Sequence, residues 1–142
     1  MTERAAMTEA ATPQHRAVTA VLLGWAGVIV FAGLMATTSD DSLGNAAMFG
    51  VVGAAMGSWV AARRSAPSLW VSLLIGGLHA VEQMAYFGAG VSSGEDATRL
   101  FIDAFGLLTG LLVAGGAAMA LRSSRGAGPT APRPDERTGS TV

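Results

Sequence analysis

The sequence predicts an all-α fold, a four-helix transmembrane bundle whose helices run up and down, antiparallel to one another. Four apolar stretches cover residues 17–36, 43–62, 68–90 and 100–121, and nearly all charged residues lie outside them. Each stretch has about 20 residues, the length with which an α-helix crosses the hydrocarbon core of a bilayer. Hydrophobic residues make up 51% of the chain, although polar segments at both ends dilute that value.

The basic residues predict the orientation of this bundle. All nine are arginines. Eight of them lie before the first stretch, between the second and third, or after the fourth: Arg4, Arg16, Arg63, Arg64, Arg122, Arg125, Arg133 and Arg137. The other two connections are acidic, with Asp40 and Asp41 in one and Glu95, Asp96 and the ninth arginine, Arg99, in the other. Since basic connections stay in the cytoplasm, both termini are expected there, in a multi-pass protein of a bacterial plasma membrane.

The elements follow in order along the chain. Residues 1–16 are polar and are predicted to form a disordered cytoplasmic tail, as are residues 122–142, which are rich in Arg, Ser, Gly, Pro and Thr. The first stretch contains no charged residue, and Trp25 lies deep within it, so its ring is expected inside the bundle. Pro67 suits the start of the third helix, because the first turn does not need its missing N–H.

Small residues recur at spacings of four in the second and fourth stretches. Gly53 and Gly57 form a GxxxG pair, and Gly106 and Gly110 repeat the spacing. Helices in lipid associate through close backbone packing, which such residues allow. These glycines are predicted to pack helices within one chain, and oligomerisation through one of these faces is the alternative.

The third stretch contains an unusual polar stripe. His79, Glu82, Gln83 and Tyr86 stand at i, i+3, i+4 and i+7, so they are predicted to share one helix face, turned to the bundle interior. An ionised glutamate facing lipid would cost several kcal/mol. Asp103 in the fourth stretch is expected level with Tyr86, one turn from Arg99, with which it is expected to pair. The stripe either fixes helix packing through hydrogen bonds, or forms a proton-linked or small-molecule site.

The order of these features resembles that of small four-span bacterial membrane proteins of the DoxX-like kind. The resemblance covers roughly residues 17–121 and rests on the acidic first connection, the glycine-rich second stretch, and the segments 77–79 (Gly-Leu-His), 88–90 (Gly-Ala-Gly) and 103–106 (Asp-Ala-Phe-Gly). It implies an accessory role in a membrane assembly, such as a redox complex. No site residue is carried over from it.

Motifs for catalysis, metal or cofactor binding are not found in the sequence. The chain has no cysteine and two histidines, too few for a zinc site built from protein ligands alone, and it lacks a phosphate-binding loop or a nucleophile motif. We therefore expect a protein that is not an enzyme, holds no cofactor or metal and binds no nucleic acid. Its expected partners are the lipid bilayer and either a larger membrane protein or further copies of itself.

Two functions remain open at this point. The first is a non-enzymatic accessory or scaffold component, in which the polar stripe holds helices in register. The alternative is a small homo-oligomeric, proton-coupled transporter or channel that uses Glu82 and His79. The sequence favours the first, because a pathway needs polar residues from several helices and the first two stretches add only Thr19, Asn45 and Ser58.

Overall fold

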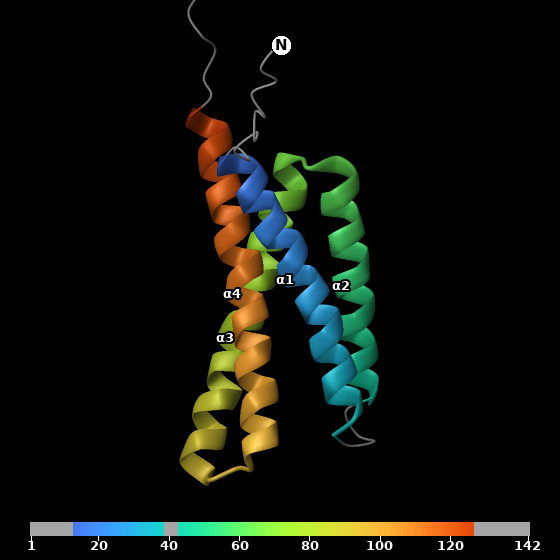
Figure 1. The fold of residues 1–142 in the computed structure, drawn as a ribbon, viewed down its shortest axis with the longest axis vertical. Coiled ribbons are helices and arrows are strands. Elements are labelled where there is room, and N and C mark those ends of the chain that lie inside the picture. Colours follow the sequence, from blue (N-terminus) through green and yellow to red (C-terminus); the bar gives the residue numbers. More distant parts are fainter. Residues whose placement is uncertain (1–12, 39–42, 127–142) are drawn as a thin grey trace, which may run out of the picture.

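The computed structural model describes residues 13–38 and 43–126, and within this part of the chain it contains four α-helices and no strand. They are α1 (Pro13–Ala36), α2 (Leu43–Arg63), α3 (Ala66–Ser93) and α4 (Ala97–Gly126). Each helix runs antiparallel to the one before it (Figure 1). The predicted all-α, up-and-down fold is therefore confirmed. Asp40, Asp41 and the outer parts of both predicted tails lie outside the described residues.

The two ends of the bundle differ in which segments they contain. At one end, here called the termini end, α1 begins, α4 ends and the short turn joins α2 to α3 (Figure 1). At the opposite end, the hairpin end, α1 ends, α2 begins and α3 connects to α4. Arg16, Arg63 and Arg125 thus lie toward the termini end, and Arg99 lies toward the hairpin end.

The helices extend further than predicted at the termini end. Residues 13–16 belong to α1 and residues 122–126 to α4, so the parts of the predicted tails next to the bundle are helical and not disordered. The guanidinium of Arg125 lies 5.8 Å from the ring centre of Trp70. This contact between a cation and an aromatic face stabilises the last turn of α4 against α3.

α3 also exceeds its predicted range of 68–90. It begins at Ala66 with Pro67 in its first turn, as predicted, and it ends at a glycine cap. Gly94 has a φ of 73°, in the left-handed region, and its N–H donates to the Gly90 carbonyl oxygen. Glycine adopts this conformation without the steric penalty of a Cβ, which allows the sharp turn toward α4.

The apolar core lies in the half of the bundle next to the termini end. Its fully buried side chains include Val21, Val60 and Val113, together with alanines from α4. Gly24 of α1 and Gly76 of α3 flank Val113, since a Cβ on either would lie 2.6 Å from one of its methyl groups. Small residues therefore let α1 and α3 approach α4 from two sides.

The four glycines predicted to pack helices all lie at contacts within the chain. A Cβ on Gly53 would lie 3.0 Å from the Ile29 side chain, and a Cβ on Gly57 would lie 3.4 Å from Cβ of Trp25. The glycines of α4 face α3 and α1: a Cβ on Gly110 would meet the backbone of Ala80 at 2.8 Å, and one on Gly106 would meet Phe31 and Gln83. The contacts of Gly106 with Gln83 and of Gly110 with Ala80 match the antiparallel register expected for α3 and α4.

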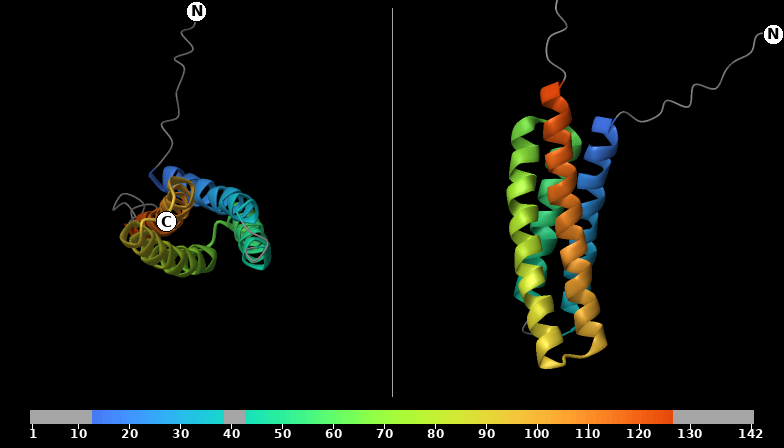
Figure 2. Two further views of the ribbon diagram at one scale, coloured as in Figure 1. Left: turned by 90° about the horizontal axis from the view of Figure 1, so that it is seen from below. Right: turned by 90° about the vertical axis from the view of Figure 1, so that its left-hand side faces the viewer.

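The bundle is open along one side. α4 packs against both α1 and α3, and α1 packs against α2, whereas α2 and α3 make little contact. Figure 1 shows the α3–α4 hairpin diverging from the α1–α2 hairpin toward the hairpin end, and the end-on view of Figure 2 shows α2 and α3 set apart. The divergence leaves space between the two hairpins.

Three helices, α1, α2 and α4, are long and apolar enough to cross a membrane by length and composition. α3 does not meet the same criterion, because His79, Glu82 and Gln83 interrupt its apolar run. Its outward side is nonetheless apolar, with Leu74 and Val81 exposed at 68% and 61%. The chain is a small membrane protein.

Candidate functional site

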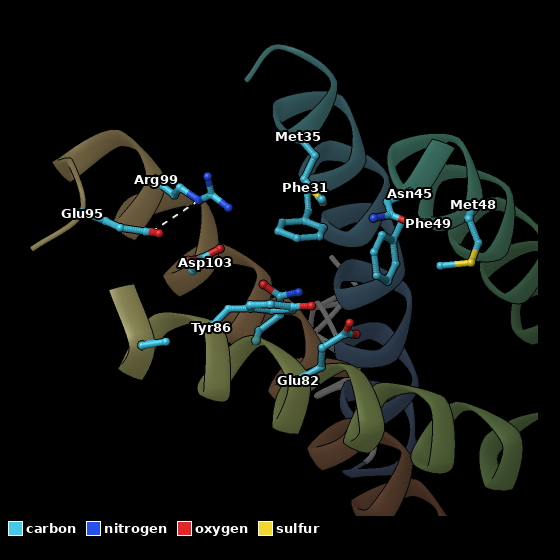
Figure 3. Close-up of a pocket in the computed structure, with 12 residues that line it drawn as sticks. Phe31, Met35, Asn45, Met48, Phe49, Glu82, Tyr86, Glu95, Arg99 and Asp103 are labelled. Atoms are coloured by element: carbon cyan, nitrogen blue, oxygen red, sulfur yellow. Dashed lines mark ion pairs between the residues drawn. The ribbon is translucent and has the colours of Figure 1, made fainter. Parts of the chain in front are cut away.

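A cavity of about 340 Å³ lies between the two hairpins toward the hairpin end. All four helices contribute to its lining, which consists of Phe31, Met35, Asn45, Met48, Phe49, Glu82, Gln83, Tyr86, Ala89, Glu95, Arg99 and Asp103. Figure 3 shows Glu82 and Tyr86 of α3 and Asp103 of α4 on one side, with Phe31 and Phe49 of the other hairpin across the space. The divergence of the hairpins thus creates a concave site.

The charges that line this cavity are unbalanced. Three carboxylates, Glu82, Glu95 and Asp103, face one guanidinium, that of Arg99. Arg99 Nε forms an ion pair with Glu95, four residues before it, at 3.3 Å. The expected ion pair of Asp103 with Arg99 is not formed among the described residues, although Arg99 lies close enough for its charge to act on Asp103. Glu82 and Asp103 therefore line the cavity without an ion-pair partner among the described residues.

Two buried polar side chains beside the cavity have no hydrogen-bond partner in the described structure. His79 is 5% exposed and both of its ring nitrogens are unpaired. Its ring is held between Phe31 and Phe49, with centre-to-centre distances of 5.3 and 5.1 Å. Gln83 is 3% exposed and its Oε1 is unpaired. Each such group loses its hydration without compensation, a cost of about 1–3 kcal/mol.

The polar stripe of α3 does not face the interior as a whole, contrary to the prediction. His79 and Gln83 are buried, whereas Glu82 is exposed and Tyr86 is 55% exposed. Three residues along a helix differ by about 60° around its axis, so Glu82 turns from the α1–α4 side toward the space beside α2. Because α2 stands away from α3, this space is open, and both side chains line the cavity from its open side. Asp103 is partly buried.

A second cavity of about 190 Å³ continues along the α2–α3 side toward the core. It shares Met48, Phe49 and Glu82 with the first cavity, and the rest of its lining is apolar apart from His79. It reaches Trp25, which is 2% exposed, as predicted for a tryptophan inside the bundle. The site is thus a polar cavity with an apolar extension.

Sequence reasoning missed several lining residues of this site, and three of them bear directly on its chemistry. Asn45, one of the few polar residues in the first two stretches, lines the cavity opposite the acidic residues. Phe31 and Phe49 enclose the His79 ring. One signal was available, since Asn45 near the start of α2 and Asp103 near the start of α4 must share the hairpin end in an up-and-down bundle. The ring cluster, formed by residues from three helices, left no such signal.

The comparisons with known proteins supply no further assignment. No family model, no curated protein and no solved structure matched the chain. Within residues 13–38 and 43–126, no group of three His, Cys, Asp or Glu side chains is arranged to hold a metal ion. What the site does must therefore be argued from the cavity itself.

Proposed function

We propose that this chain is a four-span integral membrane protein of a bacterial plasma membrane, with both termini in the cytoplasm, and that it binds a small solute in its hairpin-end cavity. The role is one of binding, as in a transporter, and not of catalysis. The apolar outward side of α3 supports four spans, because Leu74 and Val81 are exposed, line neither cavity and suit contact with lipid tails. The cluster of arginines at the termini end supports the orientation.

The observation that carries this proposal is the lining of the cavity. All four helices contribute to it, and within the described part of the chain Glu82 and Asp103 have no ion-pair partner and the amide oxygen of Gln83 has no hydrogen-bond donor. Within a bilayer, polar groups are satisfied by protein, water or ligand, since lipid tails offer no hydrogen bonds. A pathway needs polar residues from several helices, and the sequence favoured the accessory role because the first two stretches offer few. In the structure, Asn45 of α2 lines the cavity together with the polar residues of α3 and α4, so both hairpins contribute.

The half next to the termini end bears on how transport would work. Val113, Ala117 and Ala120 are fully buried there, within the apolar core. The cavity is therefore accessible from the hairpin end and closed toward the termini end. A solute would cross only after the two hairpins rearrange, which fits alternating access better than a standing pore.

The accessory role stays as a second candidate because of the open α2–α3 side. Glu82 is exposed there, and α2 and α3 make little contact. A helix of a larger membrane protein would cover both Glu82 and the gap between α2 and α3. Native mass spectrometry of the complex extracted in mild detergent separates the cases: a heteromeric complex supports this role, and a monomer or homo-oligomer contradicts it.

Single-cysteine labelling tests the proposed cavity, and the chain is suited to it because it has no cysteine of its own. Tyr86→Cys places a thiol on the cavity, and Met84→Cys places one two residues away on α3, where Met84 is 58% exposed and lines neither cavity. A membrane-impermeant maleimide added to intact cells is expected to label Tyr86→Cys rapidly, because only a hydrated thiol ionises and reacts. Met84→Cys in lipid is expected to stay unlabelled.

Equal, slow labelling at both positions would contradict a water-filled cavity and with it the proposed function. Labelling of Tyr86→Cys only after permeabilisation would keep the cavity and reverse the proposed orientation. A cysteine at Thr38, near the hairpin end, provides a positive control for access from the outside.

A further inference from the structure

We infer that the hairpin-end cavity binds a small organic cation, an ammonium group that carries an apolar substituent. This inference rests on the proposed function and names its ligand class. The first argument is charge. Glu82 and Asp103 line the cavity without an ion-pair partner among the described residues, and the one basic side chain in the lining, Arg99, is held by Glu95 at 3.3 Å. A cation balances these carboxylates, whereas an anion would be repelled by them.

The second argument is the aromatic lining. Phe31 and Phe49 lie edge to face with ring centres 5.6 Å apart, and Tyr86 lines the same cavity from α3 (Figure 3). Aromatic faces attract a cation placed within about 6 Å of the ring centre, and more strongly where water is excluded. Carboxylates combined with rings suit an organic ammonium better than a bare metal ion, which prefers a shell of oxygen ligands.

The third argument is an acceptor that lacks a donor. Oε1 of Gln83 has no hydrogen-bond partner among residues 13–38 and 43–126, although the side chain is only 3% exposed and lines the cavity. The oxygen lies beside Gly106 of α4, so an ammonium N–H becomes its donor when the Gln83 amide turns toward the cavity. Because this group is buried and belongs to neither carboxylate, it indicates a ligand independently of the charges.

The second cavity accounts for the apolar substituent. It opens beside Glu82 and is lined by aliphatic side chains that include Val52, Ile75 and Leu78. An ammonium held near Glu82 therefore has an apolar space next to it for a hydrocarbon group. Together the two cavities, of about 340 and 190 Å³, have the size of ordinary small-molecule sites.

Three probes of nearly the same shape and different charge test the inference: 3,3-dimethylbutylammonium, 3,3-dimethylbutan-1-ol and 3,3-dimethylbutanoate. Binding is measured by isothermal titration calorimetry on the full chain in nanodiscs of phosphatidylcholine, with empty nanodiscs as the blank. We expect the ammonium to bind at least about tenfold more tightly than the alcohol, which corresponds to 1.4 kcal/mol. The carboxylate is expected not to bind.

Charge-neutralising variants locate the site. Glu82→Gln and Asp103→Asn are each expected to weaken ammonium binding about tenfold or more. Asp96→Asn is the matched control, because Asp96 lines neither cavity. Its Oδ1 accepts a hydrogen bond from the backbone N–H of Arg99 at 3.0 Å, a capping role that asparagine fills equally well. This control should bind like the unchanged chain.

The outcomes separate this inference from the proposed function. Equal binding of alcohol and ammonium, or no binding of any probe, overturns the cation inference, while rapid labelling of Tyr86→Cys keeps the water-filled cavity. Ammonium binding that neither Glu82→Gln nor Asp103→Asn weakens also overturns it, because the cation then sits elsewhere. The comparison of probes on the unchanged chain holds even where a variant fails to fold.

Discussion

The two halves of the bundle treat their buried polar groups in opposite ways. Next to the termini end, Trp25 donates its indole N–H to the Ser72 hydroxyl at 3.2 Å inside an apolar core. Toward the hairpin end, His79 and Gln83 are also buried, and their side chains have atoms without a hydrogen-bond partner in the part of the chain that the structure describes. The first arrangement stabilises the fold. The second leaves binding capacity unused by the protein itself, which is what a ligand site requires.

Glycine packing gives the largest expected contrast. A Cβ on Gly116 would lie 2.9 Å from the Ala17 carbonyl oxygen and the Val21 nitrogen, whereas a Cβ on Gly115 would have no neighbour within 4 Å. We expect Gly116→Ala to lower the free energy of unfolding by about 2–3 kcal/mol, since backbone atoms must move apart. Gly115→Ala should leave it unchanged or raise it by up to about 1 kcal/mol. Unfolding in mixed micelles with rising SDS measures both.

A similar loss for the two alanine variants would show that α1 and α4 are not closely packed near the termini end. The contrast between a closed half and an open half would then fail at its firmer side.

Removal of a buried polar group should have opposite signs in the two halves. Ser72→Ala leaves the Trp25 N–H without an acceptor and is expected to lower the free energy of unfolding by about 1–3 kcal/mol. His79→Phe removes two unpaired nitrogens, keeps the ring contacts with Phe31 and Phe49, and is expected to raise it by about 1 kcal/mol. The same SDS titration applies. If both variants lost stability equally, the His79 nitrogens would have hydrogen-bond partners in the membrane, and the contrast between the two halves would fail.

The ion pair at the hairpin end should have the smallest effect. The Arg99 side chain is 66% exposed and that of Glu95 is 34% exposed. Exposed pairs contribute less than about 1 kcal/mol, so we expect Arg99→Gln to change the free energy of unfolding by no more than that. A loss of about 3 kcal/mol would mean that charge pairing, and not helix packing, holds the hairpin end together. Glu95→Gln is the companion variant.

Much of the architecture followed from the sequence. Lengths and boundaries of the helices were predicted to within a few residues, because apolar runs, Pro67 and the charged connections are local signals. The register of α3 against α4 was also predictable, since a short connection permits little else, and Gly110 does lie against Ala80. The inward position of Trp25 followed from its depth.

The candidate site was predicted from the sequence only in part. His79, Glu82, Gln83, Tyr86 and Asp103 were singled out, and all five line one or both of the cavities. Their division into buried and exposed members was not predicted. Helix periodicity gives the angle between side chains, but the environment at each angle depends on where the neighbouring helices stand.

The sequence by itself determined the four helices, their antiparallel order and the small residues at their contacts, because these depend on neighbouring residues and short connections. Only the tertiary structure decided that α2 would stand away from α3. It thereby decided that Glu82 would be exposed, that Asn45 would lie opposite Asp103, and that Phe31 and Phe49 would enclose His79. The physical reason is that these relations join side chains from different hairpins, whose spacing is set by packing across the whole bundle.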